Sequence, residues 1–318
     1  MDPPSVSLLA RDEESGAVCI RCTVSGQTEW RFEHSAPRSS LKTPPEARVF
    51  PSQFKNFDYC PSPDGTDANL LVMFHGLGDS PTPFTKLGKQ FSLPQTALLA
   101  LRAPFALPLE LGYGWFECID LAKGDFIQPQ RGEKRRVQSL QRCLAELDKV
   151  LEVLLTCGWA HRELFLFGYS QGGTVAMEWT LHGHKAFGGV VAVAAGLVEE
   201  RQWSELWPPE SFDSNVPTAS SSTEIPASSV DCLIIAGHRD TTVSPRWAKK
   251  SALLWGDAAE VAFFDKKHDM LRSPEEAKAV MTFFGSRLVR ISAWEQDPDV
   301  HLIGAGGENG GAFVNRIT

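Results

Sequence analysis

A serine within the pentapeptide Gly-Tyr-Ser-Gln-Gly, residues 168–172, is the feature that most constrains the fold of this chain. The apolar run 164–167 directly precedes it, and such a short run is typical of a strand buried on both faces of a parallel sheet. Residues 172–179 then predict a helix whose first turn lacks bulky side chains. A sharp turn between such a strand and helix exposes its serine at the end of the sheet. The pattern therefore predicts that Ser170 is a nucleophile.

Size and composition predict one globular catalytic domain with appended segments. The chain has 318 residues, of which 42% are hydrophobic and 22% are charged, so it can bury a large core. Its net charge of −8 argues against a nucleic-acid partner, because phosphates favour a basic surface. The longest apolar run, 188–198, is shorter than the roughly 20 residues that span a bilayer, so we expect no integral membrane segment.

Cysteine usage and the first residues indicate a cytoplasmic location. The seven cysteines form an odd set, and four of them fall in predicted elements of the core: Cys118, Cys143, Cys157 and Cys232. Free thiols in a reducing compartment are the simplest interpretation. Cys19 and Cys22 lack a second pair at zinc spacing, so we expect no metal site. No basic segment leads into an apolar stretch at the start of the chain, so no secretory signal is indicated.

Apolar strands alternate with amphipathic helices from about residue 50 onward. The predicted strands are 70–74, 96–101, 164–167, 189–195, 232–236 and 261–264, and the predicted helices are 82–91, 132–157, 172–179, 245–255 and one that opens at Ser273. At that last helix start, Ser273 can cap, Pro274 fits the first turn and Glu276 completes a capping box. The alternation predicts an α/β fold class, with a mostly parallel sheet covered by helices on both faces.

Three segments fall outside this alternation. Residues 1–49 mix charges with Ser and Pro, and they predict an N-terminal extension that is partly disordered or forms a small hairpin around 18–32. Residues 203–229 are rich in Pro, Ser, Thr and Glu, which indicates a surface insertion. Residues 292–318 are rich in Gly, Asp and Asn and predict a loose tail. The catalytic domain is therefore expected to span 50–291.

A serine hydroxyl needs a histidine to accept its proton and a carboxylate to orient that histidine. In folds with a turn like the one at Ser170, the acid and then the histidine follow the serine along the chain, each on a loop after a strand. Asp240 follows the predicted strand 232–236, and His268 follows 261–264. We therefore predict a catalytic triad of Ser170, Asp240 and His268.

Neighbouring residues compete for two of these roles. His238 lies beside Asp240 but precedes it, which is the wrong chain order for the base. Asp231 opens a strand, and Asp265 lies only three residues before His268, so both are weaker candidates for the acid.

The same chemistry needs backbone N–H groups that face the negative oxygen of a tetrahedral intermediate. One is expected from Gln171, directly after the serine. The other is expected from the loop His-Gly-Leu-Gly-Asp at residues 75–79, where two glycines let the amide of Leu77 point inward. His75 and Asp79 are expected to fix this loop by hydrogen bonds rather than to react.

These motifs together resemble the phospholipase/carboxylesterase family, which includes the acyl-protein thioesterases. The resemblance rests on residues 75–79, on Gly-Tyr-Ser-Gln-Gly-Gly at 168–173 and on the loops of Asp240 and His268, and it covers roughly 65–290 without the insertion. It implies an alpha/beta-hydrolase fold that needs no metal or organic cofactor. It also implies cleavage of carboxylic esters or thioesters, often with an acyl chain in an apolar groove.

The resemblance extends to one further motif and has two departures. Trp115 and Phe116 resemble a Trp-Phe pair that the family places near the active site, which makes them candidates for lining the substrate groove. Core packing is the alternative. Asp240 is not followed by the proline that is common in the family, and Lys266 and Lys267 precede His268 where a small residue is common.

We therefore expect a serine hydrolase that cleaves small ester or acyl-thioester substrates through an acyl-enzyme on Ser170. Two alternatives stay open. One is a non-catalytic binding protein that kept the fold and docks partners through its extension and insertion. The other is a peptidase on the same fold. The intact set of triad candidates favours an enzyme, and the sequence does not indicate the oligomeric state.

Overall fold

The computed structural model describes residues 42–202 and 228–291 in full, together with the backbone of five strands outside these ranges. The chain divides into two compact units, and each is described by itself. The larger unit is Leu41–Leu288, and the smaller unit combines Met1–Ser40 with Val289–Thr318.

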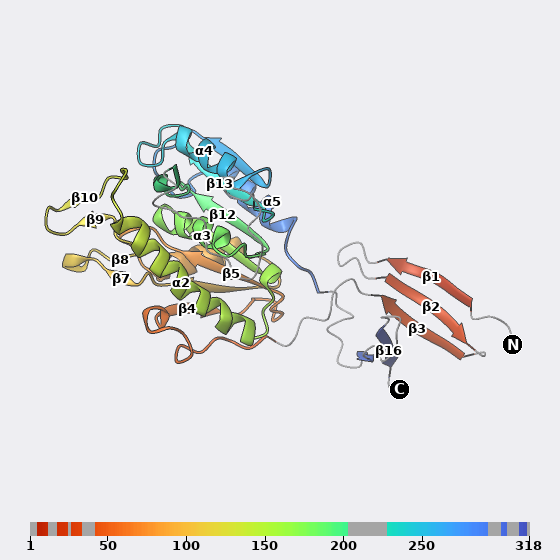
Figure 1. The fold of residues 1–318 in the computed structure, drawn as a ribbon. Coiled ribbons are helices and arrows are strands. Elements are labelled where there is room, and N and C mark those ends of the chain that lie inside the picture. Colours follow the sequence, from red (N-terminus) through yellow and green to blue (C-terminus); the bar gives the residue numbers. More distant parts are fainter. Residues whose placement is uncertain are drawn as a thin grey trace, which may run out of the picture. The chain divides into compact units, whose positions relative to one another are not determined.

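A seven-stranded sheet forms the centre of the larger unit, in the order β14-β13-β12-β11-β5-β6-β4 (Figure 1). The strands are β4 (Phe57–Cys60), β5 (Asn69–Phe74), β6 (Thr96–Leu101), β11 (Leu164–Tyr169), β12 (Gly189–Val193), β13 (Cys232–Gly237) and β14 (Ala259–Phe264). Each neighbouring pair is parallel except β4 and β6, which pair antiparallel. This is the mostly parallel sheet of an alpha/beta-hydrolase fold, as predicted.

In the described ranges 42–202 and 228–291, five helices cover the two faces of this sheet: α1 (Pro81–Phe91), α2 (Arg135–Thr156), α3 (Gln171–Leu181), α4 (Pro245–Trp255) and α5 (Pro274–Gly285). The side chains of β5 alternate between two buried clusters, because successive strand residues point to opposite faces. The cluster that contains Phe74 also holds residues of α2, α3 and α4, whereas the cluster that contains Met73 holds residues of α1 and α5. The predicted arrangement of helices on both faces is confirmed.

Two helix ends illustrate how local sequence sets the element boundaries. Gly158 follows α2 with φ +95°, a left-handed conformation that favours glycine and ends the helix. Ser273 caps α5 by accepting a hydrogen bond from the amide of Glu276 at 3.2 Å. The expected return bond of a capping box is missing among the described contacts, because the carboxylate of Glu276 pairs with Lys266 and accepts from the amide of Arg272. The prediction that Glu276 completes a capping box was therefore wrong, whereas the cap by Ser273 is present.

Short elements fill the connections of the larger unit. Two hairpins of two-residue strands, β7 (Phe105–Ala106) with β8 (Tyr113–Gly114) and β9 (Ile119–Asp120) with β10 (Asp125–Phe126), lie between β6 and α2. Four 3-10 helices occur among its described residues: η1 (Ser52–Phe54), η2 (Pro108–Glu110), η3 (His161–Glu163) and η4 (Glu199–Gln202). In the described part of the chain, no helix is both long enough and apolar enough to cross a membrane.

The smaller unit contains a five-stranded antiparallel sheet in the order β1-β2-β3-β16-β15. Its strands are β1 (Ser5–Arg11), β2 (Val18–Val24), β3 (Gln27–Glu33), β15 (Val300–Ile303) and β16 (Ala312–Arg316). Strands thus occur in both segments where the sequence suggested an extension and a loose tail. The side chains of Cys19 and Cys22, and residues 203–227 of the expected insertion, lie outside the described residues. The predicted domain boundaries stay a prediction.

Candidate active site

Ser170 occupies a sharp turn between β11 and α3. Its backbone has φ 51° and ψ −121°, a conformation that is strained for a residue with a side chain. The turn is anchored by a hydrogen bond from the Ser170 amide to the carbonyl of Val193 at 2.9 Å. A Cβ atom at Gly172 would lie 2.3 Å from the carbonyl oxygen of His75, so only glycine lets the start of α3 approach the loop after β5.

Three side chains from three strand ends form one hydrogen-bonded chain. Ser170 Oγ lies 2.8 Å from His268 Nε2, and His268 Nδ1 lies 2.8 Å from Asp240 Oδ2. Because the Asp240 carboxylate only accepts, His268 Nδ1–H donates to it, and Nε2 is left to accept from the serine hydroxyl. Asp240 is 4% exposed, and its other oxygen accepts from the amides of Thr242 and Val243 at 2.8 and 2.9 Å. The structure thus brings the predicted residues together.

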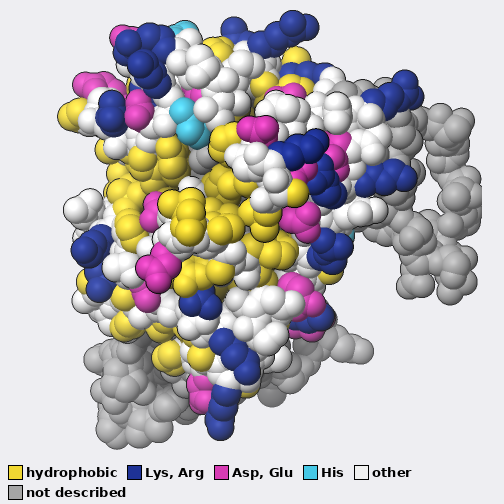
Figure 2. Space-filling view, turned by 90° about the vertical axis from the view of Figure 1, so that its left-hand side faces the viewer, with side chains coloured by type: hydrophobic (Ala, Val, Ile, Leu, Met, Phe, Trp, Pro, Cys, Tyr) yellow, Lys and Arg dark blue, Asp and Glu magenta, His cyan; other side chains and the backbone are white. Residues whose placement is uncertain are grey.

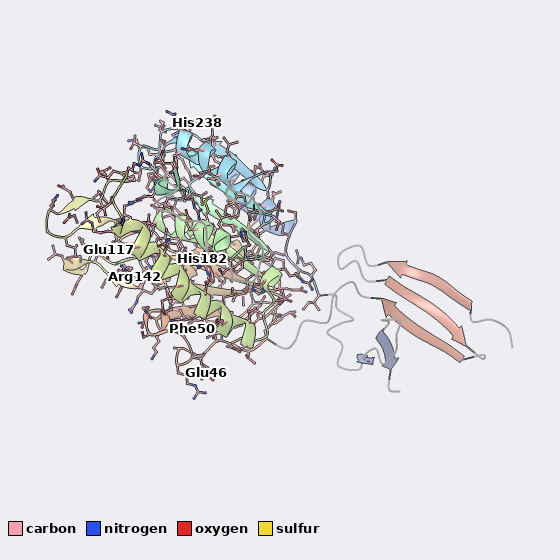
Figure 3. All side chains as sticks on the ribbon, viewed as in Figure 1. Glu46, Phe50, Glu117, Arg142, His182 and His238 are labelled. Carbon is pink, nitrogen blue, oxygen red and sulfur yellow. The ribbon has the colours of Figure 1, made fainter. Side chains whose placement is uncertain are left out.

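The competing residues lie elsewhere and have other partners. His238 is exposed, stacks on the ring of Phe263 and lies at the outer edge of the larger unit (Figure 3). Asp231 pairs with Arg287 at 2.7 Å, and Asp265 pairs with Arg239 at 2.6 Å. The structure brings none of the three competitors into the chain of contacts at Ser170.

The amides of Leu77 and Gln171 are available to an incoming oxygen. Gln171 begins α3, where an N–H group has no acceptor within the helix. Within the described residues, neither this amide nor that of Leu77 has a hydrogen-bond acceptor. The loop of Leu77 is tied down by two backbone bonds to the hairpin β7–β8, from Gly78 to Tyr113 at 2.9 Å and from Tyr113 to Asp79 at 3.2 Å.

His75 supports the same loop through the hydrogen bonds of its ring. Its ring is fully buried, Nδ1–H donates to the carbonyl of Gly76 at 2.7 Å, and Nε2 accepts from the amide of Ala103 at 3.0 Å. Burial lowers the pKa of His75, because a charged imidazole would lose its hydration there. A neutral ring satisfies both contacts, which agrees with the expected supporting role. Asp79 contributes through its side chain, which accepts from the amide of Ser80 at 2.8 Å.

The side chain of Gln171 was not anticipated from the sequence. Its Oε1 accepts from the amide of Trp115 at 2.8 Å, and its Nε2 donates to the carbonyl of Phe116 at 2.9 Å. Trp115 is fully buried and donates through Nε1 to the carbonyl of His75 at 2.7 Å, while Phe116 is 5% exposed. These positions fit the core-packing interpretation of the Trp-Phe pair, since both side chains are buried and the Trp115 ring donates to the backbone of the site.

Exposed apolar side chains occupy the two hairpins next to this site. We call them the apolar rim: Leu109, Leu111, Leu121 and Phe126, which are 90%, 60%, 69% and 63% exposed. The carbonyl of Leu111 would lie 3.1 Å from a Cβ at Gly78, and Cys118, next to the second hairpin, accepts a bond from Gln171. Figure 2 shows a broad gathering of hydrophobic side chains on the face of the larger unit that carries the hairpins.

A buried ion pair fixes the loop that carries His268. Lys266 and Glu276 are each 3% exposed in their side chains, and the ammonium contacts both the carboxylate and, at 3.4 Å, the carbonyl of Met270. Lys266 therefore points away from solvent, whereas Lys267 is exposed. Among the described residues, no group of three or more His, Cys, Asp or Glu side chains is placed to hold a metal ion.

Comparison with known proteins finds similarity to several hydrolases. Residues 59–209 match the phospholipase/carboxylesterase family. An uncharacterized hydrolase of Mycosarcoma maydis is 30% identical over 46% of this chain and 56% of its own length. Acyl-protein thioesterase 1 of Cryptococcus neoformans is 26% identical over 42% of this chain and 56% of its own length. The chain thus spans about half the length of the curated relatives it matches. The crystal structure of esterase PE8 aligns with a TM-score of 0.57 at 20% identity, over 73% of this chain and 98% of that one, which shows the fold alone.

Proposed function

We propose that the chain is a serine hydrolase that cleaves carboxylic esters or thioesters, a proposal supported by the match of residues 59–209 to the phospholipase/carboxylesterase family. The observation that carries the proposal is the run of 2.8 Å contacts from Ser170 through His268 to Asp240, because it gives a hydroxyl both a proton acceptor and an oriented base. We assign the activity to residues 50–291.

Acylation uses the three side chains in sequence. The Oγ of Ser170 attacks the substrate carbonyl carbon while His268 Nε2 takes the hydroxyl proton. Asp240 stabilises the imidazolium that forms, and two backbone amides and the ring N–H donate to its carboxylate. The amides of Leu77 and Gln171 bind the oxyanion. The carbon–oxygen or carbon–sulfur bond then breaks, and the leaving alcohol or thiol takes the proton from His268.

Deacylation repeats these steps with water. His268 accepts a proton from a water molecule, whose oxygen attacks the acyl carbon. The bond to Ser170 breaks, its Oγ regains the proton from His268, and a carboxylic acid leaves. The chain supplies every group that these steps need, so the proposal requires no cofactor.

The apolar rim supports a preference for apolar substrates, and the cysteines support a cytoplasmic location. Exposed leucines on the hairpin that is hydrogen-bonded to the loop of Leu77 favour substrates with an apolar acyl part, because burying apolar surface is favourable. The described cysteines are all free thiols, which is compatible with the cytoplasm.

A fluorophosphonate probe tests the proposal directly, since it reacts only with an activated serine. We expect labelling of the wild-type chain and none of Ser170→Ala. Equal labelling of both, or none of a folded wild-type chain, would overturn the proposal in favour of a non-catalytic protein. Turnover of p-nitrophenyl esters, acyl-thioesters and peptides then separates an esterase from a peptidase, and cleavage of peptides alone contradicts our choice.

A further inference from the structure

Tyr169 is the last residue of β11, directly before Ser170, and it touches two other parts of the site. Its hydroxyl donates to the backbone carbonyl of His268 at 3.0 Å. Its ring lies against the imidazole, with 5.7 Å between ring centroids and 35° between the planes. A Cβ at Gly76 would lie 2.9 Å from the ring, so the same side chain also packs against the loop of Leu77.

We propose that Tyr169 is a positioning residue, whose hydroxyl holds the backbone of His268 so that the imidazole stays in line between Ser170 and Asp240. The proposal rests on the function proposed above, since it assigns the base of that reaction a second support. Tyr169 touches neither the substrate carbonyl nor the proton that moves, and it acts only through His268.

The surroundings of His268 show why a backbone support matters. The two ring nitrogens are hydrogen-bonded to Ser170 and Asp240, and these bonds orient the side chain. Among the described backbone contacts, the main chain around His268 is held by one turn bond, from the amide of Asp269 to the carbonyl of Lys267 at 2.9 Å. Before His268, the loop is tied down at Lys266 by Glu276 and by the amide of Arg239, which donates to the Lys266 carbonyl at 3.0 Å. At His268 itself, the Tyr169 hydroxyl is the only donor to the carbonyl among the described residues.

Tyr169 stays a donor across the pH range in which a histidine base works. Burial raises the pKa of Tyr169, and the nearby carboxylates of Asp269, Asp240 and Asp79 raise it further, against an opposing effect of Arg272. The side chain of an unperturbed tyrosine has a pKa of about 10. The bond to His268 is therefore not expected to titrate under neutral conditions.

The test compares Tyr169→Phe with Tyr59→Phe. Each substitution removes one hydroxyl from a half-buried ring, and Tyr59 loses a bond of the same length, 3.0 Å to Asp67, at the edge of the sheet. We expect Tyr169→Phe to lower kcat on a p-nitrophenyl ester by about five- to tenfold, the effect of about one hydrogen bond, with KM changed by less than about twofold. Tyr59→Phe should leave kcat unchanged, and the melting temperatures of both variants should fall by similar amounts.

A readout that needs no turnover accompanies these rates. In proton NMR spectra, the Nδ1 proton of His268 should exchange with water faster in Tyr169→Phe than in the wild type or in Tyr59→Phe, because the imidazole moves more freely. Unchanged kcat and unchanged exchange in Tyr169→Phe would overturn the proposal. A wild-type chain that hydrolyses no ester would instead reject the proposed function, and the exchange rates would still decide whether Tyr169 holds His268.

Discussion

Asp240 is 4% exposed and accepts three hydrogen bonds, whereas Leu109, on the hairpin β7–β8, is 90% exposed and lies in a left-handed conformation at φ 56°. The two residues represent two regions of the larger unit. Around Ser170, the side chains of the triad are buried or half-buried, and each is hydrogen-bonded to a named partner. In the apolar rim, large hydrophobic side chains lie in solvent. The contrast suggests that the buried region fixes the geometry of the reaction, whereas the exposed rim can contact different substrates.

The largest expected effect comes from a change in the buried region that keeps its shape. Asp240→Asn places an amide N–H opposite His268 Nδ1, so the imidazole must adopt the wrong tautomer and Nε2 can no longer accept a proton. We expect kcat on a p-nitrophenyl ester to fall by about 10³- to 10⁴-fold. Asp265→Asn is the control, because that carboxylate pairs with Arg239 at the surface and should keep full activity. A loss smaller than about tenfold in Asp240→Asn would remove Asp240 from the triad.

Losing one charge of the buried ion pair that holds the loop of His268 should lower stability strongly. Lys266→Met leaves the carboxylate of Glu276 buried without its partner, which costs about 3–5 kcal/mol of unfolding free energy. Lys267→Met is the matched control, since that side chain is exposed and should change stability by less than about 0.5 kcal/mol. The double variant Lys266→Met, Glu276→Leu removes both charges and should regain much of the unfolding free energy that Lys266→Met loses. Urea unfolding measures all of these, and equal costs for the two lysine variants would contradict the prediction.

The sequence predicted the reaction region better than the rim, for a physical reason. Ser170, Asp240 and His268 each follow a short apolar strand, so their placement depends on signals within a few residues. The hairpins β7–β8 and β9–β10 consist of two-residue strands that exist through bonds to distant loops, such as Tyr113 with Asp79, and a local pattern does not contain those partners.

The same argument explains what was missed within the fold. Strand β4 is half-buried along its length and joins the sheet antiparallel at its edge, so its residues lack the continuous apolar signal of β5 or β11. The contacts of the Gln171 side chain join residues more than fifty positions apart. The sequence pattern did not pair Lys266 with Glu276, because its partner lies ten positions away on the next helix. The catalytic roles of Ser170, Asp240 and His268 stay predictions until a probe or a variant tests them.

A smaller effect is expected on the free energy of unfolding when the pH is lowered, because the buried His75 resists protonation. The unfolded chain protonates His75 near its ordinary pKa of about 6.5, whereas the folded chain, in which burial lowers the pKa, does so only at lower pH. The unfolded state then binds more protons, so stability falls as pH drops below about 6.5, by up to about 1.4 kcal/mol per pH unit. Urea unfolding at about pH 7.5 and about pH 5.5 measures this slope. His75→Gln cannot titrate and should lose less stability between the two; an identical loss would show that His75 does not contribute.

The smallest effect is expected at the rim, and it should depend on the substrate. Leu109→Asn removes an exposed apolar side chain and suits the left-handed backbone, so the unfolding free energy should change by less than about 0.5 kcal/mol. If Leu109 contacts the acyl part of the substrate, kcat/KM for a long-chain p-nitrophenyl ester should fall by about three- to tenfold, because one leucine contact with a chain is worth about 1 kcal/mol. An acetyl ester, too short to reach the rim, should be hydrolysed at the wild-type rate.

Leu253→Asn is the matched control for this prediction. Leu253 is 82% exposed on α4, outside the two hairpins, and its substitution removes the same apolar surface from the same larger unit. Its kcat/KM should be unchanged for both esters. A chain-length-dependent loss in Leu109→Asn alone would assign substrate selection to the rim and sharpen the division between the two regions. Equal losses on long and short esters would contradict this division, because the rim would then affect the reaction itself. The route would be Leu111, whose carbonyl lies close to Gly78 in the loop of Leu77.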